Sequence, residues 1–232
     1  MSSALGRYAL LVTAALVSGS GHDGPAAGRV GLVQQVAETT IALPAPVDSA
    51  GATLSHVLKA RRSVREFASR PLSRMEISQL LWAAQGVTHP DGLRTSPSAG
   101  ALYPLELYLS TPDGFFRYRP RDHRLVRLGT ADLRAAMQRA ALGQEAVGTA
   151  PAVFVIAAAY RRTAVKYGPE RGARYVHIEV GHAAQNLLLE ATALGLGSVP
   201  IGAFNDAELA RALGLPADHE PLYLIPVGEP RR

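Results

Sequence analysis

The sequence predicts an α+β fold, because helical and strand-like patterns are intermixed and several strands follow one another in hairpin order. The strongest helical pattern covers residues 175 to 194, where apolar residues recur every three or four positions on two faces. We expect this helix to be buried nearly all round. Residues 152–159 are an unbroken apolar run, which is typical of a central strand. Three shorter strand patterns predict a β-meander at 105–110, 115–119 and 124–128.

The remaining elements are marked by capping and turn residues. Thr53 can cap a helix that runs to about residue 64. Ser73 and Glu76 form a capping box before a second helix, which Gly86 ends. A loop rich in Pro, Gly and Ser follows at 88–100. We further expect helices at 132–142 and 205–213, a last strand at 222–227 and a polar, mobile segment at 161–174.

The composition fits one large domain. The chain has 232 residues, of which 47% are hydrophobic, and a formal net charge of +5. Its basic residues are scattered as arginine pairs and are not interleaved with aromatic residues, so we do not expect nucleic-acid binding. The sequence contains no cysteine, which excludes disulfides, thiolate nucleophiles and cysteine-ligated metals.

The N-terminal residues differ in character from the rest of the chain. Residues 1–27 contain Arg7 and an apolar run at 8–17, which indicates a signal peptide or a disordered extension. This run is too short for a stable membrane span. A cleaved signal peptide would place the protein in the periplasm or outside the cell, and otherwise it would be cytoplasmic. We expect an extended arm at 28–52 and the folded domain at 53–232.

Two segments have residue types that suit a ligand. Three guanidinium groups and a hydroxyl fall within one or two helical turns at Arg61, Arg62, Ser63 and Arg65. Such a cluster can bind a phosphate dianion, or it can be a solvated basic helix end stabilised by the helix dipole. The loop at 95–104 has small residues and exposed backbone donors that could approach an aromatic ring, although it also fits a plain surface loop.

Other combinations of polar residues give weaker indications of a metal or catalytic site. His177, Glu179 and His182 lack the spacing of a zinc-binding helix, so we interpret them as polar groups of the core or of an interface. The sequence shows neither a Ser-His-Asp arrangement nor a Gly-x-Ser-x-Gly turn. The residues therefore give no sign of a protein nucleophile.

Several short segments, taken together and in order, resemble a known family. They are Arg61–Arg65, Pro97–Tyr108, Gly143–Gln144, Gly181–Leu187, Gly195–Gly197 and Pro200–Phe204. Their order resembles the nitroreductase family of FMN-dependent oxidoreductases, and within it the SagB-type dehydrogenases. Those dehydrogenases are related to oxidases that aromatise azoline rings in ribosomal peptides. The resemblance extends from about residue 53 to residue 230.

The resemblance implies a central mixed, mostly antiparallel sheet flanked by helices, in an intertwined homodimer with FMN at the interface. It assigns Arg61, Arg62, Ser63 and Arg65 to the FMN phosphate and ribityl chain. It assigns Pro97, Ser98, Ala99 and Gly100 of the other subunit to the flavin. It places Gln144 against the isoalloxazine or ribityl group, Pro200, Ile201 and Gly202 along the ring, and Arg231 or Arg232 on the phosphate. Ala101 departs from the family pattern, because many simple nitroreductases have Asn there.

The implied chemistry is hydride transfer between the flavin N5 and a small organic molecule, with NAD(P)H as the reductant. Lys166 and Tyr167 resemble the pair to which azoline oxidases assign proton abstraction. A buried lysine could act as a base with the tyrosine as relay, or the two could be an exposed polar pair. The acceptor pocket would be walled by Tyr103, Tyr175 and Phe204. The alternatives are an azoline dehydrogenase that uses oxygen, a non-catalytic dimeric flavin-binding module, and a basic binding protein without a cofactor.

Overall fold

The computed structural model describes residues 39–47 and 51–231. The predicted signal peptide, most of the predicted arm and Arg232 lie outside these described residues. The described residues belong to one compact unit.

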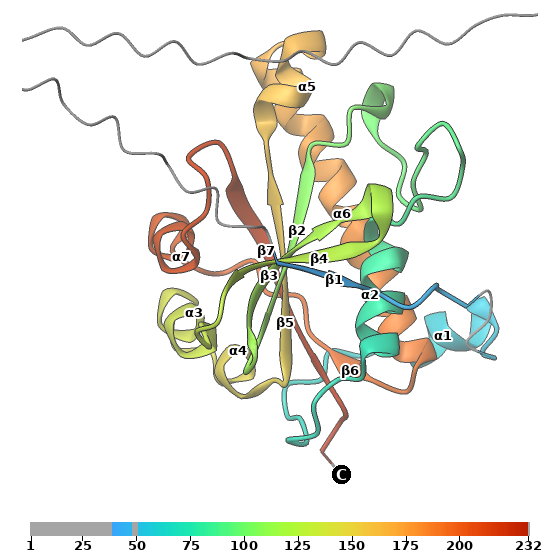
Figure 1. Ribbon diagram of the computed structural model, residues 1–232, viewed down its shortest axis with the longest axis vertical. Coiled ribbons are helices and arrows are strands. Elements are labelled where there is room, and N and C mark those ends of the chain that lie inside the picture. The colour runs from blue at the N-terminus through green and yellow to red at the C-terminus, as the bar shows by residue number, and fades with distance from the viewer. Residues whose placement is uncertain (1–38, 48–50, 232) are drawn as a thin grey trace, which may run out of the picture. The chain divides into compact units, whose positions relative to one another are not determined.

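A seven-stranded sheet forms the centre of this unit (Figure 1). The strand order is β1 (Thr40–Ala42), β4 (Arg124–Gly129), β3 (Gly114–Arg119), β2 (Leu105–Thr111), β5 (Ala152–Ala158), β7 (Glu220–Gly228) and β6 (Gly197–Ser198). Neighbouring strands pair antiparallel throughout this order. A parallel contact occurs at the isolated bridge between Ser63 and Ser198. The predicted α+β class, the mostly antiparallel sheet and the β-meander are therefore confirmed.

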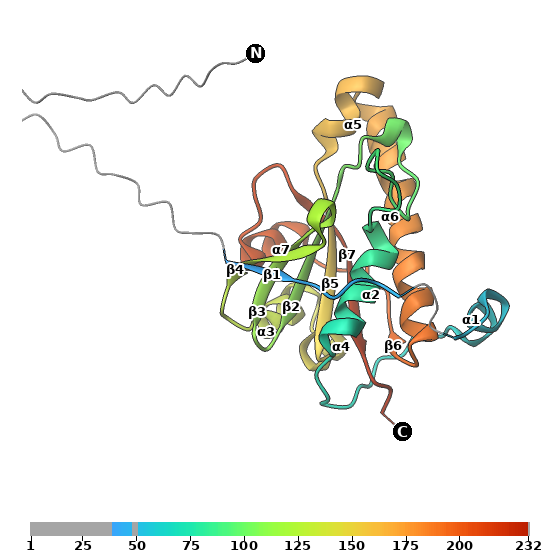
Figure 2. The same cartoon turned by 45° about the vertical axis from the view of Figure 1, so that its right-hand side comes forward.

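Helices cover both faces of the sheet, as the turned view in Figure 2 shows. One face packs against α2 (Arg74–Gln85) and α6 (Pro169–Ala193). The other face packs against α3 (Arg134–Ala140), α4 (Glu145–Thr149) and α7 (Asp206–Leu213). The alternation of β5 produces the two layers, because Phe154 faces the first helix pair while Val153 and Val155 face the second group.

The predicted helix starts follow from side-chain caps. The Thr53 hydroxyl accepts from the His56 N–H at the start of α1 (Leu54–Ala60). Ser73 and Glu76 exchange the two hydrogen bonds of a capping box at α2. Asn205 caps α7. Within the described residues, no helix has the length and apolar character needed to cross a bilayer.

The prediction that α1 runs to about residue 64 is wrong, because the helix ends at Ala60. Beyond this end the Val64 N–H donates to the Ser198 carbonyl at 3.0 Å, which draws the chain against β6. The arginine cluster is therefore extended along the edge of the sheet and is not wound on a helix.

The prediction of a mobile segment at 161–174 is also wrong. These residues form α5 (Tyr160–Tyr167) and the first turns of α6. Gly168 adopts a φ of 77° between the two helices. Pro169 is the first residue of α6, where a backbone N–H would have no acceptor within the helix, so proline's lack of one costs nothing. Gly172 lets α5 approach closely, because a Cβ there would lie 3.0 Å from the Ala164 Cα. A polar segment is thus ordered by packing against its neighbour.

The prediction that the long helix α6 is buried nearly all round is wrong for the single chain. Its inner face, which includes Val180, Ala183 and Leu187, is buried against the sheet and α2. Its outer face exposes Ile178 by 47% and also exposes Gly181 and Gln185. In the single chain the helix is therefore buried on one side only.

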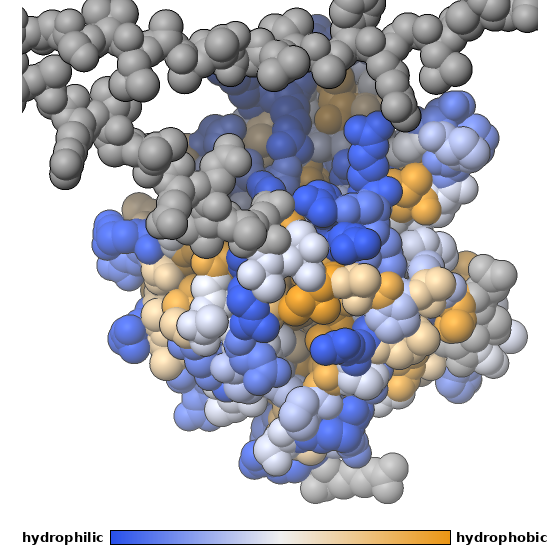
Figure 3. Space-filling model, viewed as in Figure 1, coloured by the Kyte–Doolittle hydropathy of each residue, from blue (hydrophilic) through white to orange (hydrophobic). Residues whose placement is uncertain are grey.

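Figure 3 shows hydrophobic side chains, in orange, near the middle of the face that carries β1 and α2. A pocket of about 440 Å³ opens here and is lined by residues that include Ile41, Leu43, Leu72, Ile77 and Phe116. None of the residues that the sequence assigned to a ligand lines this pocket.

Candidate functional site

The segment Ser63 to Phe67 is fixed beside the edge strand β6. Ser63 bridges Ser198, and the next residue, Val64, donates its N–H to the Ser198 carbonyl. Gly197 makes this approach possible, because a Cβ there would lie 2.8 Å from the Val64 Cβ. The backbone of the arginine cluster is therefore fixed by close contact with a strand of the sheet.

The C-terminal end of the chain runs along the same segment. Phe67 bridges Pro230, and the Arg231 N–H donates to the Glu66 carbonyl at 3.0 Å. This pairing brings Arg231 next to the cluster that contains Arg61 and Arg65. Residues that are far apart in the sequence thus contribute basic side chains to one edge of the sheet.

The arginine side chains of this edge differ in whether they have hydrogen-bond or ion-pair partners within the chain. The Arg62 guanidinium donates to the Lys59 carbonyl at 2.8 Å and to the Arg61 carbonyl at 2.7 Å. It therefore stabilises the end of α1, as the helix-end alternative proposed. In the part of the chain that the structure describes, Arg61, Arg65 and Arg231 form no ion pair with a carboxylate. Three positive charges without an acidic partner are available for an anion.

Pro200 to Gly202 leaves β6 and continues along this edge. Ile201 is fixed by Leu224, which exchanges both backbone hydrogen bonds with it at 2.8 and 3.0 Å. Gly202, the next residue, is exposed. The Gln144 amide nitrogen donates to the Ala203 carbonyl at 2.8 Å, which places Gln144 beside this segment and leaves its amide oxygen as an acceptor. The structure therefore groups Gln144 with Pro200 to Gly202.

The residues of the loop 97–100 form a second cluster with α5. A Cβ at Gly100 would lie 2.8 Å from the Tyr167 Oη and 2.9 Å from the Lys166 Nζ. The Tyr167 ring meets the Tyr175 ring edge to face, with centroids 4.9 Å apart. Lys166 is exposed, so a single chain does not provide the burial that a lysine base was expected to have.

The two clusters lie at different ends of the sheet. Figures 1 and 2 both place α5 at one end of the sheet and β6 at the other. Because Gly100 contacts α5 and Ser63 contacts β6, one chain does not bring the loop 97–100 to the arginine cluster. The other proposed pocket walls are also engaged within the chain. Phe204 packs partly buried against the core, and Tyr103 lies under the Arg94 guanidinium at 4.4 Å.

Sequence reasoning interpreted Glu179 as a polar group of the core or of an interface, but it did not single out this carboxyl group as a candidate functional residue. This residue of α6 is 2% exposed, whereas His177 contacts Tyr160 and His182 is exposed. Among the described residues, no three His, Cys, Asp or Glu side chains lie together in a group that could hold a metal ion. The helical spacing indicates this burial: Glu179 lies three residues after Val176 and four before Ala183, so it shares the buried face of the helix with them.

Burial raises the pKa of Glu179 from its usual value to about 7, against opposing effects of Ser98, Arg94 and Gln85. Between the ordinary carboxyl pKa and pH 7, the folded protein therefore binds more protons at this site than the unfolded chain does. The contribution of this group to stability falls as the pH rises through that window, by roughly 3 kcal/mol at most. A buried carboxyl group that lowers stability at neutral pH is often found at a functional site.

The fold and this edge define a class of protein: an antiparallel α+β domain whose sheet edge carries arginines without a carboxylate partner among the described residues. The nitroreductase family model matches residues 58–229. A Methanocaldococcus jannaschii protein that carries the name nitroreductase is 48% identical over 181 residues, which cover 75% of this chain and 90% of that protein. The chain belongs to the nitroreductase family, and it is a flavin-dependent oxidoreductase.

Two solved structures support the same placement. A crystal structure from Ralstonia eutropha, also described as a nitroreductase, matches with a TM-score of 0.75 and 34% identity over 83% of this chain and 90% of that one. A chain of the Escherichia coli microcin synthetase McbBCD complex, with truncated pro-MccB17 bound, matches with a TM-score of 0.66 and 25% identity. That match covers 74% of this chain and 70% of the other.

Proposed function

We propose that the protein is an FMN-dependent oxidoreductase of the SagB-type dehydrogenase kind, with NAD(P)H as its reductant and a small organic molecule as its acceptor. The observation that carries the proposal is the backbone pairing at this edge: the segment that holds Arg61 and Arg65 pairs with Ser198, just before Pro200 to Gly202, and with Arg231. These side chains make no ion pair with a carboxylate among the described residues, and a phosphate dianion would supply the missing charge.

The residues at this edge fit the parts of FMN. Arg61, Arg65 and Arg231 would bind the phosphate, with Ser63 as a further donor. Gln144 offers an amide oxygen to the ribityl chain or the ring, and exposed Gly202 lets a flat ring approach the backbone. When bound, FMN supplies hydride transfer at N5. The protein would orient the second reactant against the ring and exclude water.

A homodimer would bring the two clusters into one site. Large apolar side chains are exposed on three helices: Ile178 of α6 is 47% exposed, Leu54 of α1 66% and Val165 of α5 81%. Their burial by a second copy would be favourable. The loop 97–100, Lys166 and Tyr167 of one subunit would then face the arginine cluster of its partner. The same contact would bury Lys166, which could act as the base with Tyr167 as a relay.

The second candidate function is dehydrogenation of an azoline-like ring with oxygen as the final acceptor. The Lys166–Tyr167 pair favours it, as does the similarity to the microcin synthetase chain. Reduction of the flavin by an azoline substrate and not by NAD(P)H would select this candidate. If neither the azoline substrate nor NAD(P)H reduces the bound flavin, a non-catalytic module is favoured instead. An exported protein would meet little NAD(P)H, which would also favour a different donor.

Mixing two inactive variants tests the shared site. One variant is Arg61→Ala with Arg65→Ala, and the other is Lys166→Ala. If the arginines of one chain work with Lys166 of the other, each mixed dimer has one intact site. Random exchange of subunits should then restore about a quarter of the wild-type rate.

Each variant alone, unfolded and refolded at the same concentration, is the control for this mixing experiment. If both clusters act within one chain, every site in the mixed dimer carries a defect. The mixture would then be no more active than the two separate variants, which would contradict the shared site.

A further inference from the structure

The pocket of about 440 Å³ beside β1 and α2 is separate from the residues assigned to FMN, none of which lines it. Three parts of the chain form its walls: β1 with the residue that follows it, the start of α2, and the strands β2 to β4. Most of the lining side chains are apolar, and Figure 3 shows hydrophobic side chains on this face. Small-molecule sites have volumes of about 300–1,000 Å³ and mostly apolar walls with a few polar groups. The pocket therefore has the size and lining of a ligand site.

The floor of the pocket follows from the register of the sheet. Leu109 pairs with Phe116, and Phe116 pairs with Arg127, so these three side chains lie in one row across β2, β3 and β4. Leu125 precedes Arg127 by two residues and pairs with Ile41 of β1, so both point to the same side as this row. The three apolar residues of β2, β3 and β4 belong to the core that packs against α2 and α6. The register thus places one cation on an apolar face of the sheet.

Arg127 is held in position without being neutralised. Its guanidinium lies 4.7 Å from the centre of the Phe116 ring, and its Nη1 donates to the Asp113 carbonyl at 2.7 Å. The Asp113 side chain is exposed, and within the described residues its carboxylate makes no ion pair with Arg127. Because a guanidinium group has five N–H donors, Arg127 keeps donors and its charge for a ligand.

A second guanidinium group stands at the start of α2. Arg74 is the first residue of this helix, lines the pocket and makes no ion pair in the part of the chain that the structure describes. Thr111 adds a hydroxyl, which accepts from the Asp113 N–H at 3.3 Å and still has its own proton to donate. With two arginines and the one carboxylate of Asp113, the lining residues are net positive.

We propose that this pocket binds an amphipathic carboxylate, such as a medium-chain fatty acid. The apolar chain would lie against Leu109, Phe116 and Ile77, where its removal from water is favourable. The carboxylate would accept hydrogen bonds from Arg74 and Arg127, whose forked donors suit its two oxygens. The proposal goes beyond the proposed function, since this site is separate from the residues assigned to FMN.

Calorimetric titration of the purified protein at neutral pH tests this proposal with three probes that share one apolar chain. Octanoate carries the negative head group, octanol a neutral one and octylammonium a positive one. We expect octanoate to bind at least about tenfold more tightly than octanol, because its head group makes charge-assisted hydrogen bonds. Octylammonium should bind most weakly, since the pocket is net positive. Equal affinities for octanoate and octanol would overturn the proposal, as would the absence of saturable octanoate binding.

Two variants locate the head group. Arg74→Ala removes an exposed side chain that has no ion-pair partner among the described residues, so the fold should be unaffected. Arg127→Met removes the second charge but keeps an apolar side chain over Phe116. Each variant should bind octanoate about tenfold more weakly and octanol as the wild type does. Arg211→Ala is the matched control and should change neither affinity. Unchanged octanoate affinity in Arg74→Ala or in Arg127→Met would contradict the assignment of the head group.

Filling the pocket tests the place of the apolar chain. Ile77 is partly buried and lines the pocket, so Ile77→Phe would occupy space that the ligand needs. This variant should lose octanoate and octanol binding together, by at least about tenfold. Its thermal unfolding shows whether it is folded. A folded Ile77→Phe protein that binds octanoate as the wild type does would overturn the proposal.

The variant with Arg61→Ala and Arg65→Ala separates this site from the arginine cluster. We expect it to bind octanoate with the affinity of the wild type, while Arg74→Ala should bind FMN as the wild type does. Loss of octanoate binding in the Arg61 and Arg65 variant would show that the carboxylate binds the arginine cluster instead, which would overturn the proposal. A protein that binds octanoate as expected but never binds FMN would contradict the proposed function and leave this site intact.

Discussion

Replacing Arg61 and Arg65 together with alanine is expected to weaken FMN binding by roughly 2–5 kcal/mol, because each removes a charge-assisted contact to the phosphate. This loss corresponds to an affinity lower by a factor of about 30 to several thousand. The fold should survive, since the backbone of this segment is fixed by Ser198 and Gly197 and not by the arginine side chains. Titration of the flavin-free protein with FMN measures the effect.

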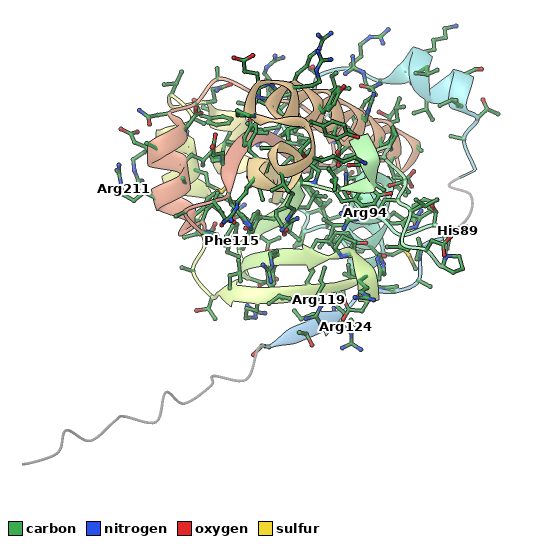
Figure 4. All side chains as sticks on the ribbon, turned by 90° about the horizontal axis from the view of Figure 1, so that it is seen from above. His89, Arg94, Phe115, Arg119, Arg124 and Arg211 are labelled. Atoms are coloured by element: carbon green, nitrogen blue, oxygen red, sulfur yellow. The ribbon has the colours of Figure 1, made fainter. Side chains whose placement is uncertain are left out.

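The matched control replaces Arg121 and Arg211 with alanine, which removes the same charge from exposed positions outside the arginine cluster. Arg211 lies at the periphery of the molecule in Figure 4. Comparing the FMN affinities of the two double variants separates the effect of local contacts from the effect of the protein's net charge. Equal FMN affinity in the wild type and in the Arg61 and Arg65 variant would remove these arginines from the phosphate site.

Lys166→Ala is expected to leave the flavin content unchanged and to slow turnover by about 10²–10⁴, the usual range for loss of a positioned acid or base. The reason is geometric: Lys166 and Tyr167 lie against Gly100, in the loop that would face the partner's flavin. Turnover is measured with the reductant and acceptor that support the wild-type reaction, across a range of pH.

Arg161→Ala is the control for this variant, because it removes an exposed cation from the same helix. It should retain most of the activity if proton transfer, and not general electrostatics, is the role of Lys166. Tyr167→Phe should show a smaller loss with an altered pH profile. Superimposable pH profiles for the wild type and Lys166→Ala would exclude Lys166 from the chemical step.

Much of the fold could be predicted because its signals are local. The capping box at Ser73 and the β-meander depend on residues close together in the sequence, and both were predicted correctly. The failure at 161–174 has a different origin. Polar composition suggested mobility, but Gly172 permits close packing of α5 on α6, and that contact depends on tertiary structure.

The site was harder to predict because its contacts join distant parts of the chain. The pairing of Arg231 with Glu66 cannot be inferred from local patterns, although the family resemblance had placed Arg231 or Arg232 on the phosphate. The helix-end alternative for the arginine cluster did not single out Arg62 as the residue that turns back to the end of α1. The exposed face of α6 was missed because its apolar residues were read as core, whereas Ile178 is 47% exposed in the single chain.

The central claim, that this chain binds FMN and passes electrons through it, is tested most directly by the absorption spectrum of the purified protein under anaerobic conditions. We expect flavin bands, either as isolated or after incubation with FMN, that bleach when NADH or NADPH is added. Bands that persist with both reductants would contradict the assigned electron donor. A protein that shows no flavin bands even after incubation with FMN would contradict the central claim itself.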